Sequence, residues 1–278
     1  MTVRIVTDST CDLPADLVAR HRIIVVPTCI NIGATGYLDG VDITRQAFYE
    51  RLPALSPHPT TSAPGVGLFL QAYEQAVAEG ATGIVSLHPP DELSSLCQVA
   101  RLAAREMYGL PVIVVDSRQL TLGLGFTVLA AAQMAEAGHT AAEIAAALPE
   151  RIRRTYVIGA LDTLEFARRG GRLSRLQASL GALLQIKPVF TVYEGELILE
   201  RVRTNSVALA RLVTRVAELG PLEALAVAHT HAPERAATLA RLGAQLFPDG
   251  SPLICVEVTP VLGIHFGPGA VGFLAIKR

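Results

Sequence analysis

Short apolar runs alternate with helix-like segments along the first half of the chain, and this alternation constrains the fold more than any other feature. Each run has the length of a buried strand, and each intervening segment has the apolar spacing of a helix. Such an alternation predicts a parallel sheet covered by helices, an α/β fold. The strand-like runs are residues 3–9, 23–32, 83–87 and 111–117, and the helix-like segments are residues 14–21, 63–80, 94–106 and 121–137.

The sequence becomes more basic near residue 152, and its pattern then changes. Apolar and polar residues alternate over residues 188–204, which indicates two antiparallel strands turning at Glu194–Gly195. Further strand-like segments, at residues 223–231, 253–260 and 270–277, follow a helical stretch or a turn. The second half is therefore predicted to be mixed α/β with antiparallel pairs.

We expect two domains from this change of pattern. The first is a parallel-sheet α/β domain at residues 1–152, and the second is the mixed α/β domain at residues 153–278. Residues 31–40 are rich in turn residues and predict a hairpin. The region around it, residues 25–60, is a candidate to pack on the second domain.

The composition indicates a chain with a large apolar interior or one that encloses something apolar. Half of the 278 residues are hydrophobic, 18% are charged, and the formal net charge is -1. No global charge favours nucleic acid or an anionic membrane. No apolar run is long enough to span a bilayer, and the N-terminus lacks the basic region of a signal peptide. The four cysteines are scattered, so we expect a reduced, cytoplasmic protein.

Several classes of catalytic or cofactor site lack their motifs. The chain has no P-loop, and the glycines at residues 123–128 do not complete a dinucleotide-binding pattern. No G-x-S-x-G nucleophile elbow is present. His229 and His231 share one face of a predicted strand, but no third ligand stands nearby in sequence. We therefore predict neither a metal nor a cofactor.

Two pairs of hydroxyl side chains precede predicted helices. Thr61 and Ser62 stand before one helix, and Ser94 and Ser95 stand before another. Simple N-capping accounts for both pairs. Alternatively, helix N-termini that converge would bind an anion through free N–H groups and the hydroxyls. Asp8 and Asp116, at the ends of predicted strands, are expected to be structural caps.

A lone histidine, His265, lies in the glycine-rich segment GIHFGPGAVGF at residues 263–273. From the residues alone, a hairpin with a locally satisfied histidine is the simpler interpretation. The alternative is a polar head-group site in an apolar protein.

Taken in order, the motifs VTDST, TSAPG, LSSLCQVA, VVDS, LDTLEFARRGGRLS, KPVF and HFGPGAVGF resemble those of the DegV family over essentially the whole chain. The resemblance implies a two-domain α/β protein that binds one long-chain fatty acid. The acyl tail would lie in a buried tunnel between or within the domains. The carboxylate would lie at the domain junction. Family members serve as the binding subunit of a bacterial fatty acid kinase, whose separate ATP-binding subunit phosphorylates the acid for phospholipid synthesis.

The resemblance also implies roles for particular residues. Thr61 and Ser94 would hydrogen-bond the carboxylate, with His265 close by and Ser62 and Ser95 as weaker candidates. We expect Gly267 and Gly269 to let the backbone turn closely around this site. Further candidates, near the head group or on the kinase-docking face, are Arg169, Arg172 and Arg203.

The chain departs from the family pattern in both hydroxyl loops. It has Ser94-Ser95-Leu96 where the family often has Ser-Gly-Thr, and Ala63 and Gly65 where polar residues are common. Two alternatives to a kinase subunit stay open. One is a hydrolase or transferase with Ser94 as nucleophile and His265 as base. The other is a carrier of apolar acids without a kinase partner.

Overall fold

A four-stranded parallel sheet forms the core of the first half, as the alternating pattern predicts. The computed structural model describes residues 2–171, 186–250 and 252–278. The strands in spatial order are β2 (Ile24–Val26), β1 (Val3–Asp8), β6 (Gly83–His88) and β7 (Val112–Asp116).

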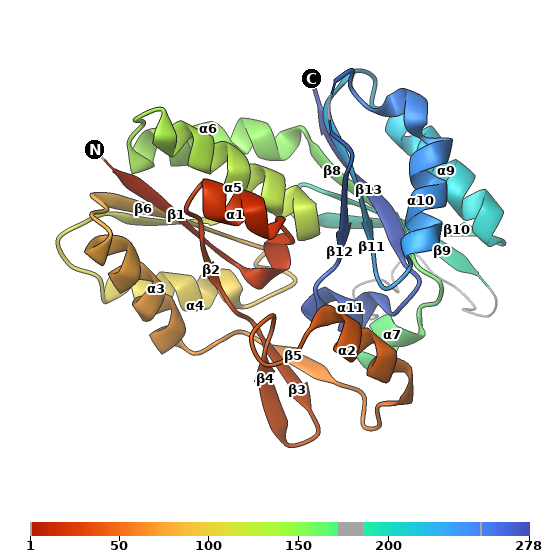
Figure 1. Cartoon of the computed structure of the whole chain (residues 1–278), viewed down its shortest axis with the longest axis horizontal. Coiled ribbons are helices and arrows are strands. Elements are labelled where there is room, and N and C mark those ends of the chain that lie inside the picture. The colour runs from red at the N-terminus through yellow and green to blue at the C-terminus, as the bar shows by residue number, and fades with distance from the viewer. Residues whose placement is uncertain (1, 172–185, 251) are drawn as a thin grey trace.

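Helices cover both faces of this sheet (Figure 1). Val6 and Ile84 belong to the core cluster beneath α3 and α4, whereas Ile5 and Val85 belong to the cluster beneath α5 and α6. Side chains of successive strand residues point to opposite faces, so an uninterrupted apolar run is what a sheet covered on both sides requires. The helices are α1 (Ala15–Arg20), α3 (Val66–Ala78), α4 (Leu96–Arg105), α5 (Thr121–Glu136) and α6 (Ala141–Arg153).

A six-stranded mixed sheet organises the second half. Its strands in spatial order are β10 (Glu196–Val202), β9 (Lys187–Tyr193), β8 (Thr155–Ala160), β13 (Val271–Lys277), β11 (Leu222–His229) and β12 (Ile254–Glu257). All neighbours are antiparallel except β11 and β12. The predicted turn at Glu194–Gly195 is confirmed, with φ of 48° and 83°.

The two faces of this sheet have different neighbours. Helices α9 (Asn205–Ala217) and α10 (Pro233–Leu242) pack on one face, and the short 3-10 helix η4 (Ala244–Leu246) follows α10. The opposite face contributes Val157, Phe190 and Leu274 to the same core cluster as α5. The inner face of the mixed sheet therefore looks toward the parallel-sheet half.

The run at residues 23–32, expected to be one strand, is two strands in different sheets. Pro27 has no N–H to donate to a ladder, and the chain leaves the parallel sheet at that point. After Thr28 it enters a three-stranded antiparallel sheet, which contains the predicted hairpin. The strands in spatial order are β4 (Thr35–Leu38), β3 (Cys29–Ile32) and β5 (Thr60–Ser62). Between β4 and β5, the sequence forms α2 (Arg45–Arg51) and the 3-10 helix η2 (Leu52–Ala54).

This small sheet and α2 pack on a helix from the far end of the chain. Ile30, Phe48 and Tyr49 form one apolar cluster with Val261 and Ile264 of α11 (Pro260–Phe266). The Tyr49 hydroxyl donates to the carbonyl of Val258 at 2.9 Å. Figure 1 shows α11 below the six-stranded sheet and next to α2 and α7 (Glu165–Arg169), both of which it contacts.

The hairpin interpretation of residues 263–273 is wrong, because the first part of this segment is the end of α11. Thr259 caps the helix by accepting from the Val261 N–H at 3.3 Å, and Pro260 occupies its first turn. Threonine followed by proline is a favourable helix start, which the glycines further on had obscured. The helix ends at Gly267, with φ of 71°, and β13 follows.

The sheet changes between Asp116, the end of β7, and Thr155, the start of β8, and α5 and α6 lie between them. Because α5 contacts both β1 and β8, the division into residues 1–152 and 153–278 stays a prediction. Among the helices of the described ranges, none is both long and apolar enough to cross a bilayer.

Candidate functional site

An apolar cavity of about 120 Å³ lies where α11, the inner face of the mixed sheet and the loop after β6 meet. Three of the predicted site residues, Thr61, Ser94 and His265, lie on its wall and come from positions far apart in the sequence. Thr10 is the fourth polar side chain among the described lining residues. Most of the remaining wall is aliphatic or aromatic. The other lining residues are Thr10, Pro89, Leu93, Leu96, Leu120, Leu161, Ala167, Phe190, Val192, Leu197, Leu199, Val261, Leu262 and Phe266.

Thr61 and His265 contact each other directly. The distance from Thr61 Oγ1 to His265 Nε2 is 3.3 Å, a hydrogen bond in which either atom can donate, depending on the histidine tautomer. Both residues are half-buried. Residues 204 positions apart therefore form one polar spot on the edge of the apolar cavity.

The strand β5, rather than a helix start, positions Thr61. Thr61 is paired with Ile30 of β3, and α3 begins only at Val66 without a side-chain cap. N-capping by Thr61 or Ser62 is therefore wrong. Ser62 is exposed, accepts a hydrogen bond from Asn31 Nδ2 at 3.3 Å, and does not line the cavity. Alternation along the strand separates the two hydroxyls.

Ser94 lies in the loop between β6 and α4. Its N–H donates to the Pro90 carbonyl at 3.0 Å, and its hydroxyl accepts from the Leu96 N–H at 3.3 Å. The hydroxyl proton of Ser94 is not used in that contact. Ser95, the N-cap residue of α4, makes no side-chain capping bond, is exposed, and is not part of the cavity wall.

His265 lies in the last turn of α11, and a glycine lets α7 approach it. A Cβ atom on Gly170 would stand 2.3 Å from His265 Nδ1, closer than any real contact. The carbonyl of Ile264 accepts from the His58 ring, Nε2 to O, at 3.0 Å, which ties α11 to the loop before β5. Neither Gly170 nor His58 was predicted from the sequence. The only signal for Gly170 is the glycine pair in ARRGGR.

Gly267 and Gly269 form the turn that follows α11, and both have positive φ, 71° and 88°. A Cβ on Gly267 would stand 2.2 Å from the Phe166 ring of α7. Thr230, directly after β11, fixes the turn, because its hydroxyl donates to the Gly267 carbonyl at 2.6 Å. The close approach to His265 itself is made by Gly170.

The predicted arginines lie on the surface where the structure describes them. Arg169, in the last turn of α7, is exposed and donates from Nε to Glu165 Oε1 at 2.7 Å. Hydrogen bonds from Arg168 and then Arg169 lower the pKa of Glu165 to about 2. Arg203 is exposed in the turn after β10. Arg172 lies outside the described residues.

A Ser–His–Asp set does exist, but it is in the core of the parallel-sheet half. His88 Nδ1 is 2.6 Å from Asp8 Oδ2, and His88 Nε2 is 2.7 Å from Ser86 Oγ. The three side chains are inaccessible to solvent. Asp8 also caps the 3-10 helix η1 (Ser9–Cys11), and Asp116 accepts from the Arg118 N–H at 2.7 Å, which confirms both as structural caps. Within the described residues, no group of three metal-binding side chains is present.

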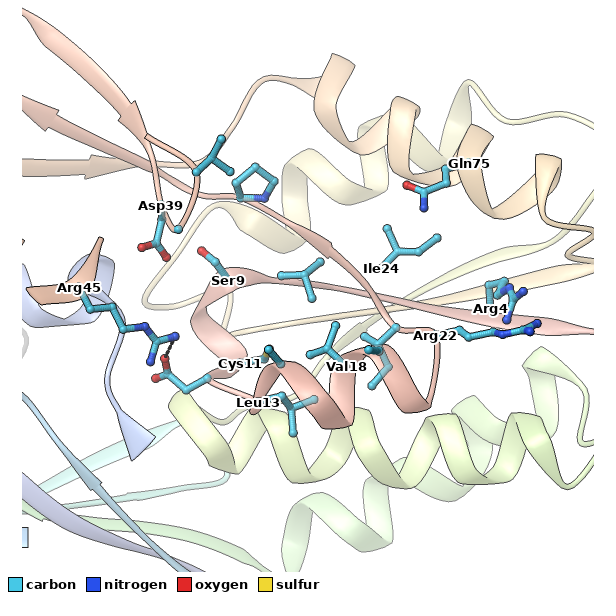
Figure 2. Close-up of a pocket in the computed structure, with 18 of the residues that line it drawn as sticks. Arg4, Ser9, Cys11, Leu13, Val18, Arg22, Ile24, Asp39, Arg45 and Gln75 are labelled. Carbon is cyan, nitrogen blue, oxygen red and sulfur yellow. Dashed lines mark ion pairs between the residues drawn. The ribbon is translucent and has the colours of Figure 1, made fainter. Parts of the chain in front are cut away.

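A larger hollow of about 850 Å³ runs along the edge of the parallel sheet, between α1 and α3 (Figure 2). Figure 2 shows Arg4 and Arg22 together at one end and Arg45 and Asp39 at the other. Two of its arginines are paired within the chain, Arg45 with Asp12 at 3.0 Å and Arg4 with Glu79 at 3.3 Å. None of the predicted site residues within the described ranges lines this hollow, so we place the candidate site at the apolar cavity.

The chain belongs to the DegV family. A family model described as "Uncharacterised protein, DegV family" matches residues 2–278. A DegV domain-containing protein of Streptomyces coelicolor is 40% identical over 99% of both chains. Among solved structures, the DegV family protein of Thermus thermophilus, reported for its fatty acid binding, is 33% identical, with a TM-score of 0.90 over both full chains. DegV of Bacillus subtilis, a fatty acid binding protein, is 27% identical, with a TM-score of 0.89, also over both full chains.

Proposed function

We propose that the chain binds one long-chain fatty acid, with its tail entering the apolar cavity and its carboxylate at Thr61, Ser94 and His265. One observation supports the proposal: these three side chains line one cavity whose other described lining residues, except Thr10, are apolar. The relatives from Thermus thermophilus and Bacillus subtilis are described as fatty acid binding, and they share this fold over their whole length.

The donors suit a carboxylate that is drawn partly out of water. An unpaired carboxylate in an apolar setting costs several kcal/mol, so it must be hydrogen-bonded. The hydroxyl protons of Thr61 and Ser94 and a protonated His265 Nε2 are three such donors. The present Thr61–His265 bond would be replaced by bonds to the ligand. Ser62 and Ser95 do not line the cavity, and we leave them out of the proposal.

We propose further that the chain performs no chemistry alone and presents the carboxylate to a separate kinase subunit. Hydroxyls and an imidazole can hold the carboxylate without a permanent opposing charge, so an oxygen stays available to attack a γ-phosphate. The exposed cations Arg169 and Arg203, with Arg172 by family position, would dock the ATP-binding subunit. A cytoplasmic location, inferred from the cysteine usage, and a role in phospholipid synthesis belong to the same proposal.

Native mass spectrometry tests the binding step directly. The protein is stripped of lipid, mixed with palmitate and sprayed under non-denaturing conditions. We expect one palmitate per chain, and a lower occupancy in the His265→Ala variant. A protein that stays free of palmitate at every ratio would overturn the proposal. Ester hydrolysis that is lost in Ser94→Ala would instead support the enzyme alternative.

The presenting role needs a second assay, with the ATP-binding subunit of a fatty acid kinase. We expect palmitate-dependent ATP consumption that falls in an Arg169→Ala/Arg203→Ala double variant, while palmitate affinity is unchanged. Arg241→Ala, at an exposed position in the last turn of α10, is the matched control. If the loaded protein supports no ATP consumption, or if the control and the double variant behave alike, the docking proposal is wrong.

A further inference from the structure

Two aromatic rings divide the space available to a ligand. The apolar cavity is bordered by Phe190 of β9 and Phe266 of α11, and the same two residues border a second hollow of about 30 Å³. We call this second hollow the inner cavity. The ring centroids are 5.5 Å apart, so the rings are in contact between the two spaces.

The apolar cavity is too small for a long acyl tail while the rings stay in place. A protein cavity of about 150 Å³ accommodates one benzene molecule. By that measure, a cavity of about 120 Å³ has room for about five carbon atoms, the tail of a six-carbon acid. The inner cavity lies directly behind the two rings but is smaller still, so the other carbons of a long-chain acid also need the space that the Phe266 ring now fills.

The inner cavity runs over the part of the mixed sheet that has the smallest side chains. Its floor includes Gly159 of β8 and Gly272 of β13, which are directly paired across the two strands. Ala228 of β11 and Ala270 complete this small-residue stretch. Glycine inside a strand often marks a place where another group approaches the backbone closely. At Gly159 the close group is the Phe190 ring, and at Gly272 it is the backbone of β8, so an acyl chain would lie against Ala228 and Ala270.

The two rings differ in how firmly they are held. Phe190 is 6% exposed and lies over Gly159, where an added Cβ would stand 2.5 Å from the ring. Phe266 is half-buried and is the last residue of α11, directly after His265 and before the glycine turn. Phe266 therefore has more freedom to move, and it lies one residue from the proposed carboxylate ligand.

We propose that Phe266 is a gate that sets the dependence of binding on chain length. Acids of about six carbons occupy the apolar cavity with the gate closed. Longer acids displace the Phe266 ring, join the two cavities and run past Phe190 along Ala228 and Ala270. This inference rests on the proposed function and adds to it the residue that selects among fatty acids.

The test measures the dissociation constants of a homologous series: hexanoate, octanoate, decanoate, laurate and palmitate. Each methylene that reaches apolar space is worth about 0.8 kcal/mol, or about fourfold in affinity. In the wild type we expect this gain to flatten after the shortest acids, where the ring must move, and to resume for longer ones. In Phe266→Ala the flat region should disappear, so that the variant binds palmitate about tenfold tighter relative to hexanoate than the wild type does.

Two further variants control for packing. Ala228→Leu fills the inner cavity, so it should weaken palmitate at least tenfold and leave hexanoate within twofold. Phe273→Leu changes a buried ring on the opposite face of β13 and should leave the ratio of palmitate to hexanoate affinity unchanged. Melting temperatures show that each variant is folded.

The outcomes separate the gate from the proposed function. If no acid binds the wild type, the proposed function fails. If acids bind, but the palmitate-to-hexanoate ratio is the same in wild type, Phe266→Ala and Ala228→Leu, the gate is wrong and fatty acid binding stands.

Discussion

Two histidines of this protein stand among similar residue types and do different things. His88 is inaccessible to solvent and lies between Asp8 and Ser86, and the Tyr73 hydroxyl in turn donates to Ser86 Oγ at 3.0 Å. His265 is half-buried and shares the wall of an apolar cavity with Thr61 and Ser94.

The His88 cluster and the His265 group differ in the partners that their polar atoms bond. The His88 cluster is closed, because its members satisfy one another within the core of the parallel-sheet half. The His265 group faces a space into which a ligand can enter. Residue identity alone would favour Asp8, His88 and Ser86 as a hydrolase triad, but access decides against it. We expect the first group to govern stability and the second to govern binding.

Disrupting the buried His88 cluster should have the largest effect, and this effect is on stability. His88→Ala removes one partner of a buried charged or hydrogen-bonded pair and is expected to lower the free energy of unfolding by about 3 to 5 kcal/mol. Urea denaturation measures this value, with exposed His139→Ala as control. Palmitate affinity of the folded fraction should stay within a few-fold of the wild type. A loss of binding without a loss of stability would reverse the comparison.

Asp12, where the two halves meet, should make stability depend on pH. Its Oδ1 accepts from the Thr259 N–H at 2.9 Å, and burial raises its pKa to about 6, although Arg45 opposes the shift. In the unfolded chain the pKa is about 4. The contribution of Asp12 to the free energy of unfolding is fully present below about pH 4. As the pH rises to about 6 and above, this contribution is lost, which lowers the free energy of unfolding by about 3 kcal/mol. Asp12→Asn should remove this part of the pH profile, which urea denaturation at several pH values detects.

A substitution at Gly170, beside His265, should weaken palmitate binding without changing a residue that is proposed to bind the carboxylate. Gly170→Ala places a methyl group 2.3 Å from His265 Nδ1 and should displace the imidazole, lowering palmitate affinity about tenfold. Gly65→Ala is the matched control, because no atom lies within 4 Å of its added Cβ. Calorimetric titration with palmitate compares the two. Equal affinities would mean that the position of His265 does not matter for binding.

The two adjacent serines give the smallest and sharpest contrast. Ser94→Ala removes one proposed donor and should lower palmitate affinity about fivefold, the value of about 1 kcal/mol for a hydrogen bond. Ser95→Ala, one residue further on, should change nothing measurable. The same titration serves both variants, and equal effects would remove Ser94 from the site.

Periodicity predicted the architecture well, because it reports which faces of a strand or helix are buried. The continuous runs of β1 and β6 and the alternation of β9 and β10 were sufficient for the two kinds of sheet. It failed where the chain changes sheets at Pro27 and where Thr259-Pro260 starts α11. Both are local signals that a window of apolar residues conceals.

The residues of the candidate site were harder to predict from the sequence than the fold was. Thr61, Ser94 and His265 were selected by resemblance to a family, since no spacing links residues so far apart. Gly170 and Phe266 matter through contacts that exist only after folding. The glycines inside β8 and β13 are a further sequence signal, which our sequence analysis did not use, since glycine is unfavourable in a strand unless something lies close to it.

Calorimetric titration of lipid-free wild type and His265→Ala with palmitate tests the central claim most directly. Hydrogen bonds to a charged group are worth about 1.5 to 3 kcal/mol, so we expect the variant to bind about ten- to a hundredfold more weakly, with its unfolding midpoint in urea nearly unchanged. If His265→Ala binds palmitate as tightly as the wild type, the carboxylate is not held at this cavity wall.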